Sequence, residues 1–390
     1  MNTSFILWLP SWYPNKLEPF EGDFIQRHAE AASQFNDIYV IKLVADPKGI
    51  GTKSTSIEVV TRHQLTEQII YFKKSSSLFG RMVGAIRGMR LYRRAIKKLI
   101  EKQGKPLLVH VHVTMKAGLL ALWLKRKYGL KFLVTEHFGI YNDTVKGKFS
   151  ERNIFFRKFT KKIIYESSLF LSVSKFLGEQ VNRLILKKKY VVIPNVVNTA
   201  FFYNKASDNI KCRFIHVSNM VPLKNVEGIL EAAALLKKTN GNFEIIFVGN
   251  KDDSKRVYAE DLGLDNVFFK GEIPYNQVAK EMQRSDVFIL FSDMENAPCV
   301  ITESLCCGTP VIATMVGGVP ELVNEKNGIL IEPRNVVGLA NAMKKMMNDH
   351  PAYDREKIAE EAKARFNYKL IGKMIADVYD SSLANLNLKD

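Results

Sequence analysis

Short apolar runs alternate with longer amphipathic stretches along the whole chain. Runs of four to seven residues begin at Phe5, Ile38, Leu107, Phe132 and Leu169 in the first half, and at Arg213, Phe243, Asn266, Asp286 and Pro310 in the second. Runs of this length read as buried strands, and helix-length stretches between them are typical of βαβ units with a mostly parallel sheet. The pattern therefore predicts an α/β fold with two successive doubly wound, Rossmann-like domains.

The pattern also indicates where the two domains meet. A chain of 390 residues exceeds one typical core, and the strands start afresh after residues 191–206. We expect a first domain at 1–195 and a second at 196–367. The tail from Phe366 to Leu383 predicts one or two amphipathic helices and no further strand, so about 368–390 are expected to return to the first domain.

Composition limits the class of protein. Hydrophobic residues make up 46% of the chain and charged residues 25%, as in soluble globular proteins. No apolar stretch reaches the roughly 18 residues that a membrane helix needs, and the N-terminus reads as a first strand rather than a signal peptide. The four cysteines show neither metal spacing nor a disulfide framework. A cytoplasmic location is expected.

Positive charge is concentrated in the first half. Residues 1–195 hold 34 of the 57 basic residues but 14 of the 40 acidic ones, a net charge of +20 against −3 for the rest. Such a domain suits an anionic membrane face, a phosphorylated acceptor or nucleic acid, or is simply well solvated. No nucleic-acid readout motif is present, so we expect no nucleic-acid partner. The basic stretch 77–105, which includes Met82, either covers the sheet or lies on a membrane surface at the inner face of the cell membrane.

Turn residues follow four of the strands predicted in the second half. They are Ser218-Asn219 with Lys224, Gly249-Asn250, Gly271 to Pro274, and Ser292 to Pro298. Parallel α/β sheets bind ligands at the carboxyl ends of their strands, at a topological switch point. The four segments are therefore expected to enclose one crevice.

The residue types in this crevice suit a nucleotide-linked sugar. Lys224 can neutralise a diphosphate. Glu303, expected in the first turn of a helix, can accept hydrogen bonds from the two ribose hydroxyls, and the positive end of the same helix favours phosphate. Glu295, which lies in the preceding loop with seven residues between it and Glu303, is placed to meet the sugar. The two carboxylates are followed by a Gly-Thr-Pro turn and by the run G-G-V-P-E at Gly317 to Glu321.

These motifs resemble those of the retaining glycosyltransferases of family 4, which have the GT-B fold. Members carry Glu-x7-Glu, then Cys-Gly-x-Pro-Val and Gly-Gly-x-Pro-Glu, and the likeness extends over nearly the whole chain. It implies an acceptor-binding first domain, a donor-binding second domain, and catalytic roles for Glu295, Lys224 and His137. The donor-binding residues that it implies, with Glu303 at the ribose, are Glu303, Asn219, Gly22, Gly249, Asn250, Ile273, Asn296, Ala297, Pro298 and Val300.

The chain departs from the family in three places. Asn219 stands five residues before Lys224, where members usually have an arginine, so another cation such as Lys251 has to compensate or donor binding is weaker. The interdomain stretch at Val192 departs from the usual motif at Val196 and Asn198. The glycine-rich loop after the first strand is reduced to Gly22.

Aromatic and histidine side chains in the first half leave alternatives open. Trp12 and Tyr13 either stack on a sugar or lipid head or pack beneath their loop. His110 and His112 alternate along one strand and so face one side of it. Because no third ligand has suitable spacing, no metal site is expected.

The resemblance implies front-face transfer, in which the leaving diphosphate helps to deprotonate the acceptor hydroxyl. The expected partners are a UDP- or GDP-sugar, which acts as a co-substrate with no further cofactor, and a glycan or lipid-linked acceptor of a bacterial surface polysaccharide. The alternatives are a nucleotide-sugar 2-epimerase of the same fold and a non-catalytic glycan-binding module.

Overall fold

The computed structural model describes residues 4–49, 54–73, 78–205, 209–250 and 252–384. The chain divides into two compact units. One comprises the residues up to Val173, Leu177–Val196 and the residues from Tyr368 onward, and the other comprises Ser174–Phe176 and Val197–Asn367. Both are α/β units built on mostly parallel sheets, as the alternation of apolar runs predicts.

The first unit contains an eight-stranded sheet in the order β3-β4-β2-β1-β5-β6-β7-β8. Its strands are β1 (Phe5–Pro10), β2 (Asp37–Asp46), β3 (Thr55–Arg62), β4 (Leu65–Lys73), β5 (Leu108–His112), β6 (Phe132–Glu136), β7 (Leu169–Ser172) and β8 (Tyr190–Val192). The helices that lie wholly or mostly in this unit are α1 (Asp23–Ala32), α2 (Leu78–Gln103), α3 (Ala117–Tyr128), α4 (Ile154–Glu166), α5 (Lys175–Leu184) and α12 (Tyr368–Ala384).

All the described neighbours in this sheet are parallel except the β3-β4 hairpin. Every residue of β1 is buried, as expected for a central parallel strand with helices on both faces. The apolar runs did not predict β3 and β4. Residues such as Glu58, Glu67 and Gln68 interrupt these strands, and β3 is an edge strand that leaves Ile57 and Val59 exposed.

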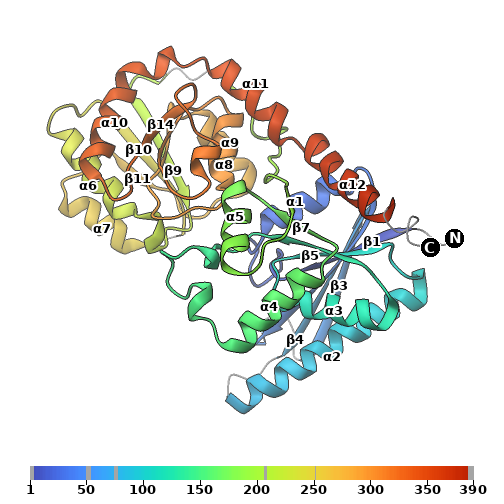
Figure 1. Ribbon diagram of the computed structural model, residues 1–390. Helices are drawn as coiled ribbons and strands as arrows, with labels where there is room; N and C mark the ends of the chain where they lie inside the picture. The colour runs from blue at the N-terminus through green and yellow to red at the C-terminus, as the bar shows by residue number, and fades with distance from the viewer. Residues whose placement is uncertain (1–3, 50–53, 74–77, 206–208, 251, 385–390) are drawn as a thin grey trace. The chain divides into compact units, whose positions relative to one another are not determined.

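The predicted C-terminal return is confirmed, and it is made by one helix. α12 packs along α1 (Figure 1), where a Cβ atom on Gly372 would lie only 2.2 Å from the carbonyl oxygen of Ala31. Two tyrosines fix the helix further. The Tyr368 hydroxyl donates to Glu30 at 2.8 Å, and the Tyr379 hydroxyl lies 2.7 Å from Nδ1 of His110.

The second unit contains a six-stranded parallel sheet in the order β11-β10-β9-β12-β13-β14. Its strands are β9 (Cys212–Ser218), β10 (Phe243–Gly249), β11 (Val267–Phe269), β12 (Val287–Leu290), β13 (Val311–Thr314) and β14 (Gly328–Ile331). Its helices are α6 (Val226–Lys237), α7 (Asp253–Asp261), α8 (Tyr275–Gln283), α9 (Cys299–Cys306), α10 (Val336–Asp349) and α11 (Arg355–Phe366).

The strand order of this sheet reverses between β9 and β12. β10 and β11 follow β9 toward one edge, whereas β13 and β14 follow β12 toward the other. Two apolar clusters of buried residues accompany the sheet, one around Phe214 and Phe247 and one around Ile215 and Phe288. Ligands of such sheets bind where the order reverses, so the carboxyl ends of β9 and β12 are the place to look for a site.

Candidate functional site

The carboxyl ends of β9 and β12 bring together two of the predicted catalytic residues, Lys224 and Glu295. Lys224 ends a 3-10 turn, Pro222–Lys224, that follows β9, and Glu295 lies in the loop that follows β12. Their side chains form an ion pair, with Nζ of Lys224 2.5 Å from Oε1 of Glu295. The Ser292 hydroxyl donates to the same oxygen at 2.7 Å. The side chain of Glu295 is buried, whereas that of Lys224 is one-fifth exposed, so Lys224 is the more accessible member of the pair.

Local turn chemistry explains the position of Lys224. The next residue, Asn225, has a left-handed backbone with φ 48°, and its side chain accepts a hydrogen bond from the amide of Gly228. Asparagine tolerates this conformation and is a preferred helix N-cap. The cap starts α6 directly after the lysine, which fixes Lys224 at the carboxyl edge of the sheet.

Glu303 lies in the second turn of α9, so the expectation of a first-turn position was wrong. The helix begins only at Cys299, after the buried Pro298. Oε1 of Glu303 accepts a hydrogen bond of 2.8 Å from the hydroxyl of Tyr275, which is the first residue of α8. Glu303 is 3% exposed, and a tyrosine that the sequence did not single out therefore orients this carboxylate.

The glycines of G-G-V-P-E support the loop that carries Glu295. A Cβ atom on Gly317 would lie 1.7 Å from the carbonyl oxygen of Glu295, and one on Gly318 would lie 1.9 Å from that of Asn296. The Gly318 amide donates to the Glu295 carbonyl at 3.1 Å. Glycine is required here because the two backbones approach each other closely.

The other predicted donor residues of this unit line the same edge. Gly249 ends β10 with φ 140°, where a Cβ would lie 1.6 Å from the Ser218 carbonyl oxygen, and its amide donates to Gly271 at 3.0 Å. Asn219 and Asn250 are exposed. Ile273, Asn296, Ala297 and Val300 are half-buried, and Pro298 is buried. Lys251, named as a substitute for the missing arginine, lies outside the described residues.

His216 is a functional candidate that the sequence reasoning missed. It is fully buried in β9, with Nδ1 2.9 Å from the Ile289 carbonyl oxygen and Nε2 2.7 Å from the Ser218 hydroxyl. Burial lowers its pKa to about 4, so the ring is neutral at pH 7. The Ser218 hydroxyl in turn accepts from the Met220 amide at 3.0 Å. His216 thus orients the turn that carries Asn219, and a histidine inside the apolar run R-F-I-H-V-S was the available signal.

Gly22 and His137 lie in the first unit. Gly22 precedes α1 with φ 69°, and a Cβ there would lie 2.7 Å from the carbonyl carbon of Trp12. Tyr13 is fully buried, and its hydroxyl donates to Glu67 at 2.6 Å. Of the two alternatives for Tyr13, it therefore packs beneath its loop and does not stack on a sugar or lipid head. Trp12 is half-buried and meets the ring of Phe138 edge to face.

His137 belongs to a buried group of histidines. Its Nε2 lies 3.2 Å from Nδ1 of His112, and one ligand atom from each of His28, His112 and His137 lies within 4.8 Å of the others. The argument that no third ligand has suitable spacing was therefore wrong, because folding brings His28 and His137 beside His112. The absence of a metal from the reaction stays a prediction.

Burial sets the charge of these histidines. It lowers the pKa of His28 to about 4 and that of His110 to about 3, and it holds the pKa values of His112 and His137 well below the usual range. Neutral imidazoles both donate and accept hydrogen bonds. At pH 7 His137 is thus a neutral polar group at the carboxyl end of β6.

Glu136, beside His137, is a second residue that the sequence did not single out. Its carboxylate is fully buried and accepts hydrogen bonds from the Thr114 amide and hydroxyl, the Tyr141 hydroxyl, and the amides of His137 and Phe138. The amides of His137 and Phe138 both donate to the same carboxylate oxygen at 2.9 Å. Glu136 therefore fixes the backbone of His137, and a carboxylate at the end of an apolar strand was the signal for it.

Two protein-family models match the chain. The model described as "Glycosyl transferases group 1" matches residues 200–365, and the one described as "Glycosyltransferase Family 4" matches residues 57–201. TuaC of Bacillus subtilis (strain 168), named as a glycosyltransferase of teichuronic acid biosynthesis, is 24% identical over 357 residues, which cover 87% of this chain and 88% of TuaC.

Solved structures share the fold at low sequence identity. Sucrose-phosphate synthase from Thermosynechococcus elongatus has a TM-score of 0.78 at 19% identity and covers 98% of this chain and 100% of its own. The Anabaena protein HepE in complex with UDP has a TM-score of 0.71 at 20% identity, covering 97% of this chain and 100% of its own. The two α/β units are those of the GT-B architecture.

Proposed function

The chain belongs to glycosyltransferase family 4, and we propose that it transfers a sugar, with retention of anomeric configuration, from a UDP- or GDP-linked donor to a hydroxyl of a lipid-linked glycan. The observation that carries the proposal is the Lys224–Glu295 pair at the carboxyl ends of β9 and β12, beside the Tyr275–Glu303 pair on α8 and α9. A cation for phosphate and two oriented carboxylates for sugar hydroxyls are what a nucleotide sugar needs.

In the proposed reaction the protein works by orientation and charge. The ammonium of Lys224 keeps one N–H on Glu295 and directs the others at the diphosphate, so that it stabilises the charge of the leaving group. Glu303, held by Tyr275, accepts from the ribose hydroxyls. The bond between the anomeric carbon and the phosphate oxygen breaks as the acceptor oxygen bonds to the same face of that carbon. The acceptor proton passes to the departing phosphate oxygen.

The relatives support this substrate class. TuaC is named for teichuronic acid biosynthesis, and the HepE structure contains UDP. We propose, in the same way, a role in a bacterial surface polysaccharide, with UDP- or GDP-sugars as the first donors to test. The reaction is proposed to need no metal, because Lys224 and the helix amides would stabilise the charge of the leaving group.

A donor screen tests the proposal. UDP- and GDP-sugars are added one at a time to the full chain, and thermal stabilisation and slow donor hydrolysis are measured. At least one donor is expected to stabilise the protein and to be hydrolysed to a sugar of unchanged anomeric configuration, as read by NMR at early times. If no nucleotide sugar stabilises the protein, the proposal is wrong, and an inverted product would exclude retention.

We further propose that α2 contacts an anionic bilayer. No described helix is long and apolar enough to cross a membrane, but α2 exposes Val83 and Ile86 among arginines and lysines. Its outer face forms a basic groove of about 870 Å³. One of its walls is Trp123, over which the Arg93 guanidinium lies at 5.2 Å. Cations and apolar side chains on one helix face suit an anionic surface.

Vesicle sedimentation tests this contact. The chain is expected to sediment with vesicles that contain phosphatidylglycerol and not with pure phosphatidylcholine, and the double variant Arg90→Ser, Arg94→Ser is expected to stay in the supernatant. The double variant Lys344→Ser, Lys345→Ser removes the same charge from α10 of the other unit and serves as the control. Equal sedimentation with both kinds of vesicle would contradict the electrostatic contact.

A further inference from the structure

A cavity in the first unit lies outside the residues considered so far. It has a volume of about 710 Å³ and is enclosed by the carboxyl ends of β1 and β2, the loop after β1, and the inner face of α2. Pockets for small ligands typically measure about 300–1,000 Å³. All of its walls belong to one compact unit, so the cavity is complete within that unit.

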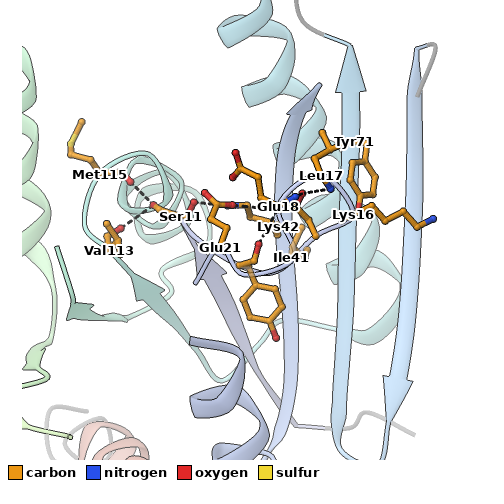
Figure 2. A network of polar contacts seen from close by, with 12 residues as sticks. Ser11, Lys16, Leu17, Glu18, Glu21, Ile41, Lys42, Tyr71, Val113 and Met115 are labelled. Atoms are coloured by element: carbon orange, nitrogen blue, oxygen red, sulfur yellow. Dashed lines mark hydrogen bonds and ion pairs between the residues drawn. The ribbon is translucent and has the colours of Figure 1, made fainter. Parts of the chain in front are cut away.

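A buried lysine forms one end of this cavity. Lys42 is 5% exposed, and its ammonium donates to the Ser11 carbonyl oxygen at 2.5 Å and to Glu21 at 3.1 Å (Figure 2). An ammonium has three N–H groups, so among the described residues one N–H of Lys42 has no acceptor. Burial lowers the pKa of Lys42 although Glu21 acts against the shift. A bound anion would supply the missing acceptor and favour the charged form.

Further positive charge lies nearby. Lys116 also lines the cavity, and its charge adds to the lowering of the Lys42 pKa. It precedes α3, whose N-terminus carries the positive end of the helix dipole. Three acidic residues also line the wall. Glu21 pairs with Lys42, Asp46 accepts from the Gly49 amide at 2.7 Å, and the charge of Glu18 acts with that of Glu21 against the lowering of the Lys42 pKa. Four lysines line the same cavity and outnumber these carboxylates: Lys16, Lys42, Lys48 and Lys116. The polar end of the cavity therefore suits a negatively charged group.

The backbone beside Lys42 is strained and held in place. Val113 and Lys116 have φ angles of 65° and 68°, which are costly for side chains other than glycine. The Ser11 hydroxyl lies 3.0 Å from the Val113 carbonyl oxygen and 2.5 Å from that of Met115, and Figure 2 shows both contacts beside Lys42. Such strain concentrates at ligand sites because the rest of the fold has to maintain it. Ser11 couples this turn to the Lys42 ammonium through its own carbonyl.

The rest of the wall is apolar and includes small residues on α2. Leu43, Met89 and Leu119 line the cavity and are only half-buried. A Cβ on Gly88 would lie 2.9 Å from the ring of Phe72, so a larger residue there would not fit without movement. Ala85 lines the cavity and is nevertheless exposed, which shows that the cavity opens beside α2.

We propose that this cavity binds the acceptor, and that the acceptor carries a phosphate group joined to an apolar chain. The phosphate would lie at Lys42 and Lys116, and the chain would lie between Leu43, Met89 and Leu119 and leave the cavity past Ala85. The outer face of the same helix exposes Val83 and Ile86, so a lipid would enter from the surface proposed to contact the bilayer. The inference rests on the proposed glycosyl transfer, because only a transferase needs an acceptor.

Direct binding tests the inference. The full chain is titrated with farnesyl phosphate, with farnesol, which lacks the phosphate, and with glycerol 3-phosphate, which lacks the chain. Farnesyl phosphate is expected to bind at least about tenfold more tightly than either half, a difference of about 1.4 kcal/mol. Equal binding of farnesol would overturn the assignment of the phosphate site, and equal binding of glycerol 3-phosphate would overturn that of the apolar site.

Two variants locate the ligand. Lys42→Met removes the cation, and Ala85→Phe fills the open end from an exposed position without disturbing the core. Each is expected to weaken farnesyl phosphate binding by at least about tenfold. Lys42→Met takes a charged hydrogen-bond donor from the phosphate, and the ring in Ala85→Phe occupies the space through which the apolar chain leaves. Unchanged binding in Ala85→Phe would overturn the proposal even if Lys42→Met fails to fold.

Matched variants away from the cavity control for general effects. Lys188 is also a part-buried lysine held by carbonyl oxygens, at Ile164 and Ser167, and Ala364 is an exposed alanine on α11. Lys188→Met and Ala364→Phe are expected to bind farnesyl phosphate within about twofold of the parent chain, a difference of about 0.4 kcal/mol. A tenfold loss in either would show that binding does not depend on the cavity, and would overturn the assignment.

Donor hydrolysis separates this inference from the function on which it rests. The same preparations are assayed for hydrolysis of the best nucleotide sugar without an acceptor. Hydrolysis without farnesyl phosphate binding would overturn the cavity assignment and leave the transferase proposal standing. Binding that the variants weaken as expected, in a chain that no nucleotide sugar stabilises, would support the cavity as a lipid-phosphate site and overturn the transferase proposal.

Discussion

The carboxyl edges of the two sheets hold their charged residues in different ways. In the second unit Lys224 and Glu295 pair with each other, and the ammonium stays partly exposed. In the first unit the fully buried Glu136 carboxylate has three backbone amides and two hydroxyls as hydrogen-bond donors. A side chain paired with another side chain can exchange partners when a ligand arrives. A side chain held by backbone amides keeps its position. The Lys224–Glu295 pair can therefore rearrange around a charged ligand, whereas Glu136 keeps a fixed geometry at the end of β6.

Removal of the Lys224 ammonium should have the largest effect on the rate of sugar transfer. Lys224→Met is expected to lower kcat/KM for transfer by roughly 10²–10³-fold, as does the loss of a donor that stabilises developing charge. Steady-state kinetics with the best nucleotide sugar measures it. Lys237→Met removes a half-buried lysine of the same unit, at the end of α6 and paired with Asp265. It should leave kcat/KM unchanged, and an equal loss in both variants would contradict the role of Lys224.

Lowering the pH should destabilise the first unit more than the second. The folded-state pKa values of His28 and His110 are about 4 and about 3, below the unfolded value of about 6.5. The unfolded chain therefore binds more protons in this window, and stability present above pH 6.5 is lost as the pH falls toward 4. At pH 5 each such histidine lowers the free energy of unfolding by about 2 kcal/mol.

The two units differ in how many of these histidines they hold. The first unit contains His28, His110, His112 and His137, whereas the second contains fully buried His216 and half-buried His350. Hydrogen exchange read by mass spectrometry, corrected for the intrinsic effect of pH, should show loss of protection in the first unit before the second. Simultaneous loss in both would contradict the difference between the units.

Glu136→Gln tests whether the first edge depends on its carboxylate. An amide nitrogen cannot accept hydrogen bonds, so at least one pair of donors loses its partner, at a cost of roughly 1.5–3 kcal/mol per bond to a charged group. Amide exchange at His137 and Phe138 should accelerate accordingly, by about 10- to 100-fold. Glu151→Gln changes an exposed carboxylate of the same unit and should leave that exchange unchanged. If Glu136→Gln does not accelerate it either, the backbone is not held by the carboxylate.

The smallest effect should come from Tyr275→Phe. The variant removes one hydroxyl and its hydrogen bond to Glu303, which contributes about 1 kcal/mol. The donor KM is expected to rise by roughly fivefold, with kcat little changed. Tyr258→Phe removes a comparable hydroxyl that donates to Glu231, and it should change neither constant. A fall in kcat alone would place Tyr275 elsewhere in the reaction.

The strands that carry the second site could be predicted because each is a continuous apolar run that ends in turn residues. The spacing of Glu295 and Glu303 is also local, so both could be named. Lys224 could be named as well, but its pairing with Glu295 could not be predicted, because the two lie 71 residues apart. Tyr275, which lies 28 residues before Glu303, could not be named at all. Only the packing of α8 and the 3-10 turn brings them together.

The first unit was harder to predict for a related reason. Nothing in the local sequence joins His28 on α1 to His137 after β6, yet folding brings a ring nitrogen of each within 4.8 Å of the other. The β3-β4 hairpin lacked a continuous apolar run because one of its strands is an exposed edge. The cavity at Lys42 depends on how closely α2 approaches Phe72, and small residues such as Gly88 allow that approach without leaving a periodic signal.

The return of α12 to α1 makes the order of synthesis matter. The first unit is encoded by the beginning of the chain and by a helix that follows the entire second unit. On the ribosome, α1 and His110 therefore wait for Gly372 and Tyr379 while residues 197–367 are made and folded. During that interval the apolar side of α1 has no helix to cover it. A nascent chain halted before residue 368 should consequently be a better chaperone substrate than one halted after residue 384.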